Sequence, residues 1–143
     1  DGTDIIAGLT ESLSFGGNGE NNTAWLIKTD SQGNEEWNKS IVENDGSSFE
    51  SIRKTIDGGY IISGGVRPIG NSDYDVWLYK IDGQGNEEWN RTFGGSEWDF
   101  GSSVQQTSDG GYIITGNTAS YGNARDVWLI KTDSEGNTAD YGD

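Results

Sequence analysis

The feature that most constrains this chain is a hairpin-like sequence at residues 75–90, DVWLYKIDGQGNEEWN, which recurs twice elsewhere. Residues 24–38 repeat the whole pattern, and residues 126–137 repeat it as far as Gly136-Asn137. Each copy joins an apolar run to an Asp-x-x-Gly-Asn turn. Aspartate stabilises such a turn through its side chain, and glycine and asparagine accept the positive φ that closes it. The chain is therefore predicted to be built from repeated β-hairpins.

A second motif, Asp-Gly-Gly-Tyr-Ile-Ile, opens residues 57–64 and 109–116, and residues 1–8 hold a diverged copy. An Asp-Gly turn followed by β-branched and aromatic residues is typical of a strand that begins after a tight turn. Successive hairpin tryptophans are 52 and 51 residues apart. A period near 50 residues with several strands per unit favours propeller-like repeats over helical ones.

Each unit is predicted to hold four strands. The first spans 47–56 and, one unit later, 101–108; the second is the Gly-Gly-Tyr-Ile-Ile run; the third covers 76–81; the fourth spans 87–93 and, one unit earlier, 35–42. The second and third strands are apolar at consecutive positions, which indicates that both of their faces are covered. Sheets packed face to face would produce this pattern.

The predicted fold class is all-β, because no window shows a helical period. We expect four-stranded antiparallel blades of the β-propeller type, with about two and a half to three repeats of ~52 residues that do not close within one chain. A single repeat domain over 1–143 would then hold a partial blade at 1–42, a full blade at 47–93 and a partial blade at 99–143.

The hairpin Trp-Leu-x-Lys-x-Asp-x-x-Gly-Asn-x-x-Trp is similar to the tryptophan-docking repeat of quinoprotein-like propellers. Together with Asp-Gly-Gly-Tyr-Ile-Ile, it resembles repeats of exported and surface proteins of archaea and bacteria. The resemblance implies a propeller fold in which a tryptophan docks between blades. It implies little about activity, because propellers host unrelated functions. The vicinal cysteine pair of the quinoprotein enzymes cannot be placed on a chain without cysteine.

Composition removes several function classes. The chain carries 24 acidic and 9 basic residues, and its net charge of -15 repels nucleic acids. No run approaches the ~18 apolar residues of a membrane span, so no membrane insertion is expected. Without histidine or cysteine there is no Ser-His-Asp triad, thiolate metal site or disulfide. We therefore predict that the protein is not an enzyme.

The carboxylates offer weak candidates for metal binding and catalysis. Calcium could be bound at three repeated turn aspartates, although a single carboxylate in each turn fits a structural role better; these residues are Asp30, Asp82 and Asp133. No other cofactor is predicted. The pairs Glu35-Glu36 and Glu87-Glu88 recur with the repeat, whereas a catalytic pair would be expected once. Adjacent residues on a strand also point to opposite faces, so neither pair resembles the acid pair of a glycosidase.

Three Asn-x-Ser/Thr sequons are candidate glycosylation sites. They begin at Asn21, Asn38 and Asn90, and the last two are equivalent positions on the predicted fourth strand. Glycans there would require export, so the expected location is extracellular or at the cell surface.

Several aromatic residues stand outside the repeat and are candidates for an interface or a ligand site. They are Trp98, Phe100, Tyr74, Tyr121 and Tyr141. Trp98 stands where the preceding unit has Gly46. Sugar binding or a subunit contact would use such residues, whereas ordinary loop packing would also account for them.

The third copy loses the pattern after Asn137, where Thr138-Ala139-Asp140-Tyr141 replaces Glu-Glu-Trp-Asn. Closed propellers typically have about 4–8 blades. We therefore expect a homo-oligomer or polymer, a ring or a filament, joined by strand completion and blade packing. Its role would be structural or adhesive. The alternatives are a carbohydrate-binding propeller lectin and a fragment of a larger propeller protein.

Overall fold

We determined the architecture from a computed structural model, which describes residues 4–10, 23–41, 46–122 and 124–139. The described residues form ten β-strands and no helix. The strands are β1 (Asp4–Thr10), β2 (Thr23–Thr29), β3 (Glu35–Ile41), β4 (Ser47–Lys54), β5 (Tyr60–Val66), β6 (Asp75–Ile81), β7 (Glu87–Phe93), β8 (Asp99–Gln106), β9 (Tyr112–Thr118) and β10 (Asp126–Thr132). The all-β prediction is confirmed. In this part of the chain no helix could cross a membrane.

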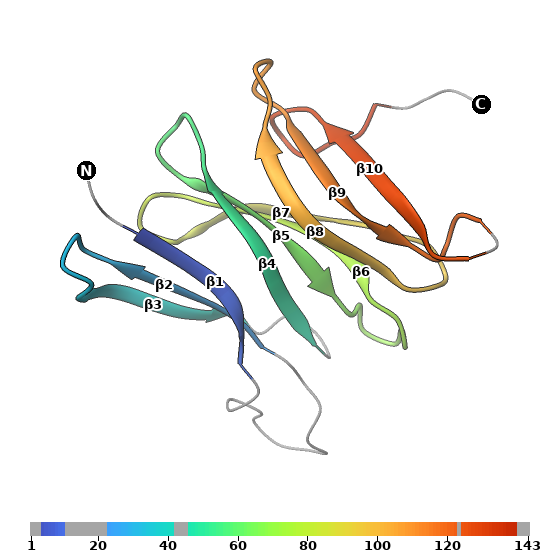
Figure 1. Cartoon of the computed structure of the whole chain (residues 1–143), viewed down its shortest axis with the longest axis horizontal. Helices are drawn as coiled ribbons and strands as arrows, with labels where there is room; N and C mark the ends of the chain where they lie inside the picture. Colours follow the sequence, from blue (N-terminus) through green and yellow to red (C-terminus); the bar gives the residue numbers. More distant parts are fainter. Residues whose placement is uncertain (1–3, 11–22, 42–45, 123, 140–143) are drawn as a thin grey trace.

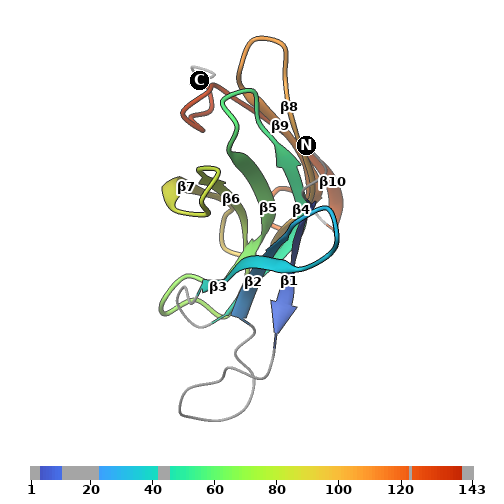
Figure 2. The same cartoon turned by 90° about the vertical axis from the view of Figure 1, so that its left-hand side faces the viewer.

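The strands form three antiparallel sheets in which every strand pairs with its neighbours in sequence. The orders are β1-β2-β3, β4-β5-β6-β7 and β8-β9-β10. We call these the first, middle and third sheets. Figure 1 shows them following one another across the molecule in chain order, without closing into a ring. Strand β4 forms one edge of the middle sheet and lies beside both β1 and β8. Figure 2 shows β6 and β7 toward the other edge of this sheet.

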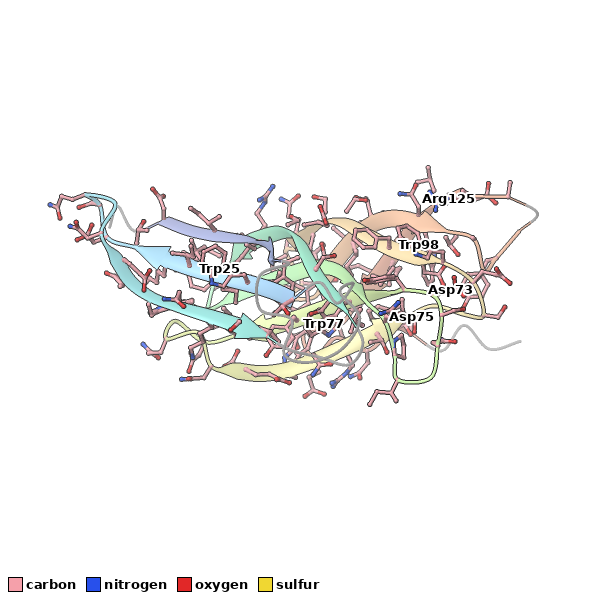
Figure 3. The ribbon with its side chains drawn as sticks, turned by 90° about the horizontal axis from the view of Figure 1, so that it is seen from below. Trp25, Asp73, Asp75, Trp77, Trp98 and Arg125 are labelled. Carbon is pink, nitrogen blue, oxygen red and sulfur yellow. The ribbon has the colours of Figure 1, made fainter. Side chains whose placement is uncertain are left out.

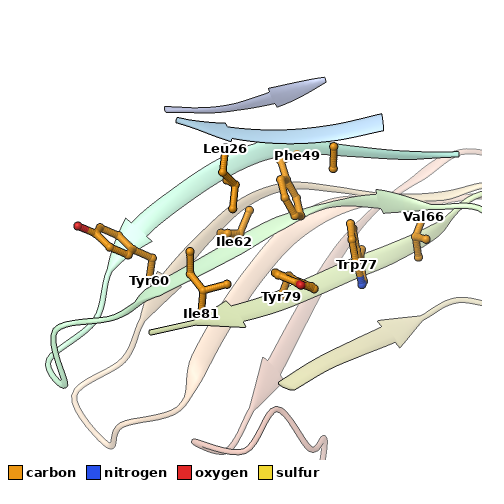
Figure 4. Close-up of a cluster of buried hydrophobic side chains, with 9 residues drawn as sticks. Leu26, Phe49, Tyr60, Ile62, Val66, Trp77, Tyr79 and Ile81 are labelled. Atoms are coloured by element: carbon orange, nitrogen blue, oxygen red, sulfur yellow. The ribbon is translucent and has the colours of Figure 1, made fainter. Parts of the chain in front are cut away.

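The sheets pack face to face. We call the side of a sheet that is turned toward the next sheet along the chain its forward face, and the opposite side its rear face. The forward face of the first sheet contributes Ala24 and Leu26 to a buried cluster. The rear face of the middle sheet supplies the rest of that cluster, including Phe49, Ile62 and Trp77 (Figure 4). The Phe49 and Trp77 rings stack at 5.0 Å between centroids.

A second cluster repeats this arrangement one sheet later. The forward face of the middle sheet contributes Ile61, Val76 and Leu78, and the rear face of the third sheet contributes Ile114 and Ile130. Both faces of the middle sheet are therefore covered, and strand β5 is buried along its whole length. This confirms for the middle sheet the burial that the consecutive apolar residues predict. In the third sheet several equivalent positions are exposed, because that sheet is covered only on its rear face.

The first strand of each unit ends earlier than expected. We predicted 47–56, but β4 ends at Lys54 because the backbone N–H of Thr55 bonds to the Gly59 carbonyl across a tight turn, 2.9 Å away. Gly58 in this turn has φ of 88°. For the same reason β8 ends at Gln106 and not at 108, because the Thr107 N–H bonds to the Gly111 carbonyl; the strand begins at Asp99, before the predicted start at 101.

Two leucines at equivalent positions test this packing. Leu78 is fully buried between sheets, whereas Leu129, at the same place in the third sheet, is 61% exposed. Leu78→Ala should lower the free energy of unfolding by about 2–5 kcal/mol, since it opens a cavity. Leu129→Ala should change it by less than about 1 kcal/mol in dilute protein. Urea denaturation of both variants measures the difference, and equal losses would contradict the arrangement of the sheets.

Candidate functional site

The forward face of the third sheet is an exposed copy of a surface that is buried elsewhere in the molecule. Val127 is 85% exposed and Leu129 is 61% exposed. One unit earlier, Val76 and Leu78 hold the equivalent positions on the middle sheet and are fully buried against the third sheet. Large exposed apolar side chains gathered on one sheet face are typical of an interaction surface.

The rear face of the first sheet is open in the same way. Ile6 is 58% exposed and Trp25 is 36% exposed. Their equivalents on the middle sheet, Ile62 and Trp77, are buried against the first sheet. Figure 3 shows Trp25 on the first sheet and Trp77 toward the centre of the molecule.

The two open faces are equivalent to the two halves of an interface that the chain contains internally. Within the chain, a forward face packs twice against a rear face, once in each buried cluster. The forward face of the third sheet and the rear face of the first sheet present equivalent side chains. A second copy of the chain could therefore bury both faces by repeating the packing that the chain already contains.

A tryptophan from each of the first two sheets docks on a turn of the next sheet. A Cβ added at Gly85 would lie 2.8 Å from the Trp37 ring, and one added at Gly136 would lie 2.7 Å from the Trp89 ring. Both glycines have positive φ, near 80°. Gly33 is the equivalent residue in the first sheet, and a Cβ there would meet no described atom within 4 Å.

The edge of β1 shows a similar opening. Gly64 and Gly116 allow the preceding strand to approach closely, because a Cβ there would lie 2.0 and 2.1 Å from backbone oxygens of Ser48 and Phe100. Gly8 is their equivalent in β1, and nothing in the described chain lies within 4 Å of a Cβ at that position. The first sheet therefore has glycines where the other sheets contact a neighbouring strand or ring.

A groove with a volume of about 560 Å³ lies beside β10. Its walls include Phe93 and Gly94 after β7, Trp128 and Leu129 of β10, and Ala139. In the described part of the chain, β10 pairs along its length only with β9, apart from one bridge between Thr132 and Thr138. The groove thus borders the β10 edge of the third sheet. At the equivalent edge of the middle sheet, β6 pairs with a fourth strand, β7.

A lysine ion pair recurs in each sheet. Lys28 lies 2.7 Å from Glu36, Lys80 lies 3.0 Å from Asp57, and Lys131 lies 2.9 Å from Asp109. Lys80 is buried and also contacts Glu88. Burial alone would lower the pKa of Lys80, but its hydrogen bonds to Glu88 and Asp57 outweigh burial and raise that pKa. These pairs hold β2, β6 and β10 to a neighbouring strand or turn.

The candidate calcium residues act as turn residues. In each hairpin, one aspartate oxygen accepts two backbone N–H bonds and the other accepts the asparagine side chain; the pairs are Asp30 with Asn34, Asp82 with Asn86, and Asp133 with Asn137. Bonds from the asparagines lower the pKa of all three carboxyls. Across the described ranges, no group of three or more acidic, histidine or cysteine side chains could hold a metal.

The paired glutamates lie on opposite faces, as their adjacency predicts. Glu87 accepts a hydrogen bond from the Tyr79 hydroxyl at 2.9 Å, whereas Glu88 contacts Lys80. Of the sequon residues, Asn38 is exposed on β3 and Asn90 is half-buried on β7, both edge strands. Asn21 lies outside the described residues. Glycosylation stays a prediction.

Three of the five candidate aromatics come together. Trp98 stacks on Phe100 at 5.2 Å, and Tyr74 lies edge-on to both. The Arg125 guanidinium lies 4.7 Å from the centre of the Trp98 ring, and Figure 3 shows the two side chains together. Tyr121 instead packs on Trp128, and Tyr141 lies outside the described residues. Mutual packing accounts for the three rings.

Sequence reasoning missed the open faces. The signal was present, because Ile6, Trp25, Val127 and Leu129 occupy repeat positions whose equivalents are apolar in the middle unit. Recognising it required knowing which sheet covers which face.

A scan against protein-family models finds no match to the chain, and a search of the curated proteins finds none either.

The Asp57 ion pair predicts a pH dependence. Hydrogen bonds from Thr55 and Gly59 and the Lys80 charge outweigh burial and lower the pKa of Asp57 from 3.8 to about 2. Ionised Asp57 therefore stabilises the fold above pH ~4, and this contribution is lost as the pH falls toward 2. Asp57→Asn should lower the free energy of unfolding at pH 7, and the difference from the wild type should shrink between pH 4 and 2. Urea denaturation at each pH measures this difference. A difference that does not change with pH would contradict the stabilising role of ionised Asp57.

Proposed function

We propose that this protein is a non-enzymatic structural or adhesive protein of the cell exterior that assembles head to tail with copies of itself. The observation that carries the proposal is the pair of open faces. The forward face with Val127 and Leu129 and the rear face with Ile6 and Trp25 repeat the two sides of an interface that the chain builds twice internally. Burial of such apolar surface is the main driving force for association.

Assembly of this kind is heterologous, since the forward face of one copy meets the rear face of the next. Such contacts produce a ring if the rotation closes and a filament if it does not. The described residues form three sheets, so two copies would bring together about six, which is within the usual 4–8 blades of a propeller. A β-propeller blade identity for the sheets is part of this proposal.

The first sheet supports the same mechanism. Gly33 would accept a docked ring, as Gly85 and Gly136 do, and Gly8 would accept a close strand, as Gly64 and Gly116 do. An added strand could likewise extend the third sheet at the groove beside β10. Covering these edges would also prevent the non-specific strand pairing that exposed edges invite.

The charge distribution fits a solvated assembly whose copies associate most readily in salt. With a net charge of -15, copies repel one another at long range. Salt screens this repulsion beyond a Debye length of about 8 Å at physiological ionic strength. Glycans at Asn38 or Asn90, on edge strands, would add to the solvation of the exterior.

A charge placed on the open face tests the proposal. Val127→Glu should reduce the average mass of the assembled protein at least about two-fold, the loss expected if a ring of two copies dissociates, because a carboxylate would be buried at the joint between copies. Ile56→Glu is the matched control: Ile56 is 87% exposed but lies in the β4–β5 turn, away from both faces. Light scattering coupled to size-exclusion chromatography measures the mass.

The proposal predicts oligomers for the wild type and the Ile56→Glu control, and smaller species for Val127→Glu. A wild-type chain that stays monomeric at all accessible concentrations and salt levels would contradict self-assembly. That result would favour the alternative in which further repeats of a longer propeller cover the same faces. An equal loss of mass in both variants would mean that the added charge alone, and not its place on the open face, prevents association.

A further inference from the structure

We propose that Asp75 and Asp99 form a binding site for a calcium-like divalent cation at the joint between the middle and third sheets. Asp75 begins β6 and Asp99 begins β8, so the two carboxylates come from different sheets. This site is separate from the turn aspartates and does not depend on self-assembly.

Asp99 is completely buried, yet one of its oxygens has no partner. Its Oδ2 accepts hydrogen bonds from the Gly95 N–H at 2.9 Å and the Ser120 hydroxyl at 2.6 Å. Its Oδ1 is buried and accepts no hydrogen bond, and neither does the buried Oδ1 of Asp75. An unpaired buried carboxylate oxygen costs several kcal/mol unless a proton, an ion or a donor satisfies it. Two such oxygens at one joint therefore point to a missing positive partner.

The two carboxylates converge on the same backbone segment. A Cβ added at Gly94 would lie 2.2 Å from Asp75 Oδ1 and 2.8 Å from Asp99 Oδ2, so both carboxylates lie against this glycine. Burial and the negative charge of Asp99 raise the pKa of Asp75, whereas hydrogen bonds from Ser120, Thr118 and Gly95 outweigh burial and lower the pKa of Asp99. None of the ion pairs among the described residues involves either aspartate.

The preceding joint shows that the fold does not require carboxylates here. Ser47 begins β4 as Asp99 begins β8, and Thr23 begins β2 as Asp75 begins β6. The buried Ser47 hydroxyl accepts a bond from the Ala24 N–H and donates one to the Ile41 carbonyl, each 3.1 Å long. A neutral hydroxyl thus completes the first joint. At the second joint Asp99 Oδ2 fills a similar structural role, but the buried Oδ1 atoms of Asp99 and Asp75 accept no hydrogen bond.

A hard divalent cation suits this pair of ligands. Calcium accepts carboxylates, backbone carbonyls and water in flexible geometry, whereas magnesium demands a near-ideal octahedron. With two carboxylates, affinity in the 10⁻⁴–10⁻³ M range of extracellular calcium modules is expected. Bound there, the cation would tie the middle sheet to the third.

Thermal unfolding at pH 7 with and without 10 mM CaCl₂ tests the site, against NaCl of matched ionic strength. This calcium concentration is roughly ten to a hundred times the expected dissociation constant. Calcium should raise the Tm of the wild type by a few degrees. Asp99→Ser and Asp75→Thr, which copy the first joint, should lose this rise. Asp73→Asn is the matched control, because it removes the same charge two residues from Asp75 and should keep the rise.

The variants also report on the fold. Asp99→Ser should melt below the wild type without calcium, because hydrogen bonds from Ser120, Thr118 and Gly95 outweigh burial and lower the pKa of Asp99, so its ionised form stabilises the fold at pH 7. A wild-type Tm that does not respond to calcium would overturn the site and indicate that the two acids share a proton. An equal response in all four proteins would also overturn it, since general screening of the acidic surface would then explain the effect.

Discussion

Face-to-face packing of the sheets is the interaction on which the rest of the structure depends. Strands β5 and β6 carry apolar side chains at consecutive positions, so the middle sheet is stable only if both of its faces are covered. The first and third sheets provide that cover through two clusters that share one geometry. Because the units repeat, the same geometry leaves one uncovered apolar face at each end of the series. The proposed assembly follows from this repetition.

Smaller contacts fix how one sheet sits on the next. Trp37 and Trp89 dock on Gly85 and Gly136, where a side chain would collide with the ring. A large ring over a bare glycine leaves little freedom for sliding, so these contacts set the relative position of the sheets. Within the middle sheet, the buried Lys80 is held between Asp57 and Glu88, which ties β6 to the β4–β5 turn and to β7. Removing both carboxylates would leave a buried ammonium group without an acidic partner.

Local sequence patterns predicted the strands and turns well, because their causes are local. The Asp82-Asn86 turn closes through bonds within five residues, and β7 spans Glu87–Phe93 as expected. The ends of β4 and β8 were misplaced because Thr55 and Thr107 favour strands by propensity but are used by the following turns. There, hydrogen bonding in the turn outweighs β-propensity.

The surfaces between units could not be predicted in the same way. The exposure of Val127 depends on which sheet lies beside β10, and nothing near Val127 in sequence encodes that. The approach of Asp75 to Asp99 likewise joins the starts of two strands in different sheets. Aligning the units would have marked the second place, since Asp99 replaces Ser47 at a position that is buried in each case, but not the first, since Val127 matches Val76. Repeats are thus informative where one copy differs from another.

Cross-linking across the open faces tests the central claim most directly. The chain has no cysteine, so single cysteines can be placed without interference. Ile6→Cys marks the rear face of the first sheet, and Leu129→Cys marks the forward face of the third. Inside the chain, residues equivalent to this pair lie in the same buried cluster: Ile62 with Leu26, and Ile114 with Leu78. Under mild oxidation, mixing the two variants should yield a disulfide-linked heterodimer, while neither variant alone yields much dimer. Homodimers formed as readily as the heterodimer, or no cross-link in the mixture, would contradict head-to-tail packing of the sheets.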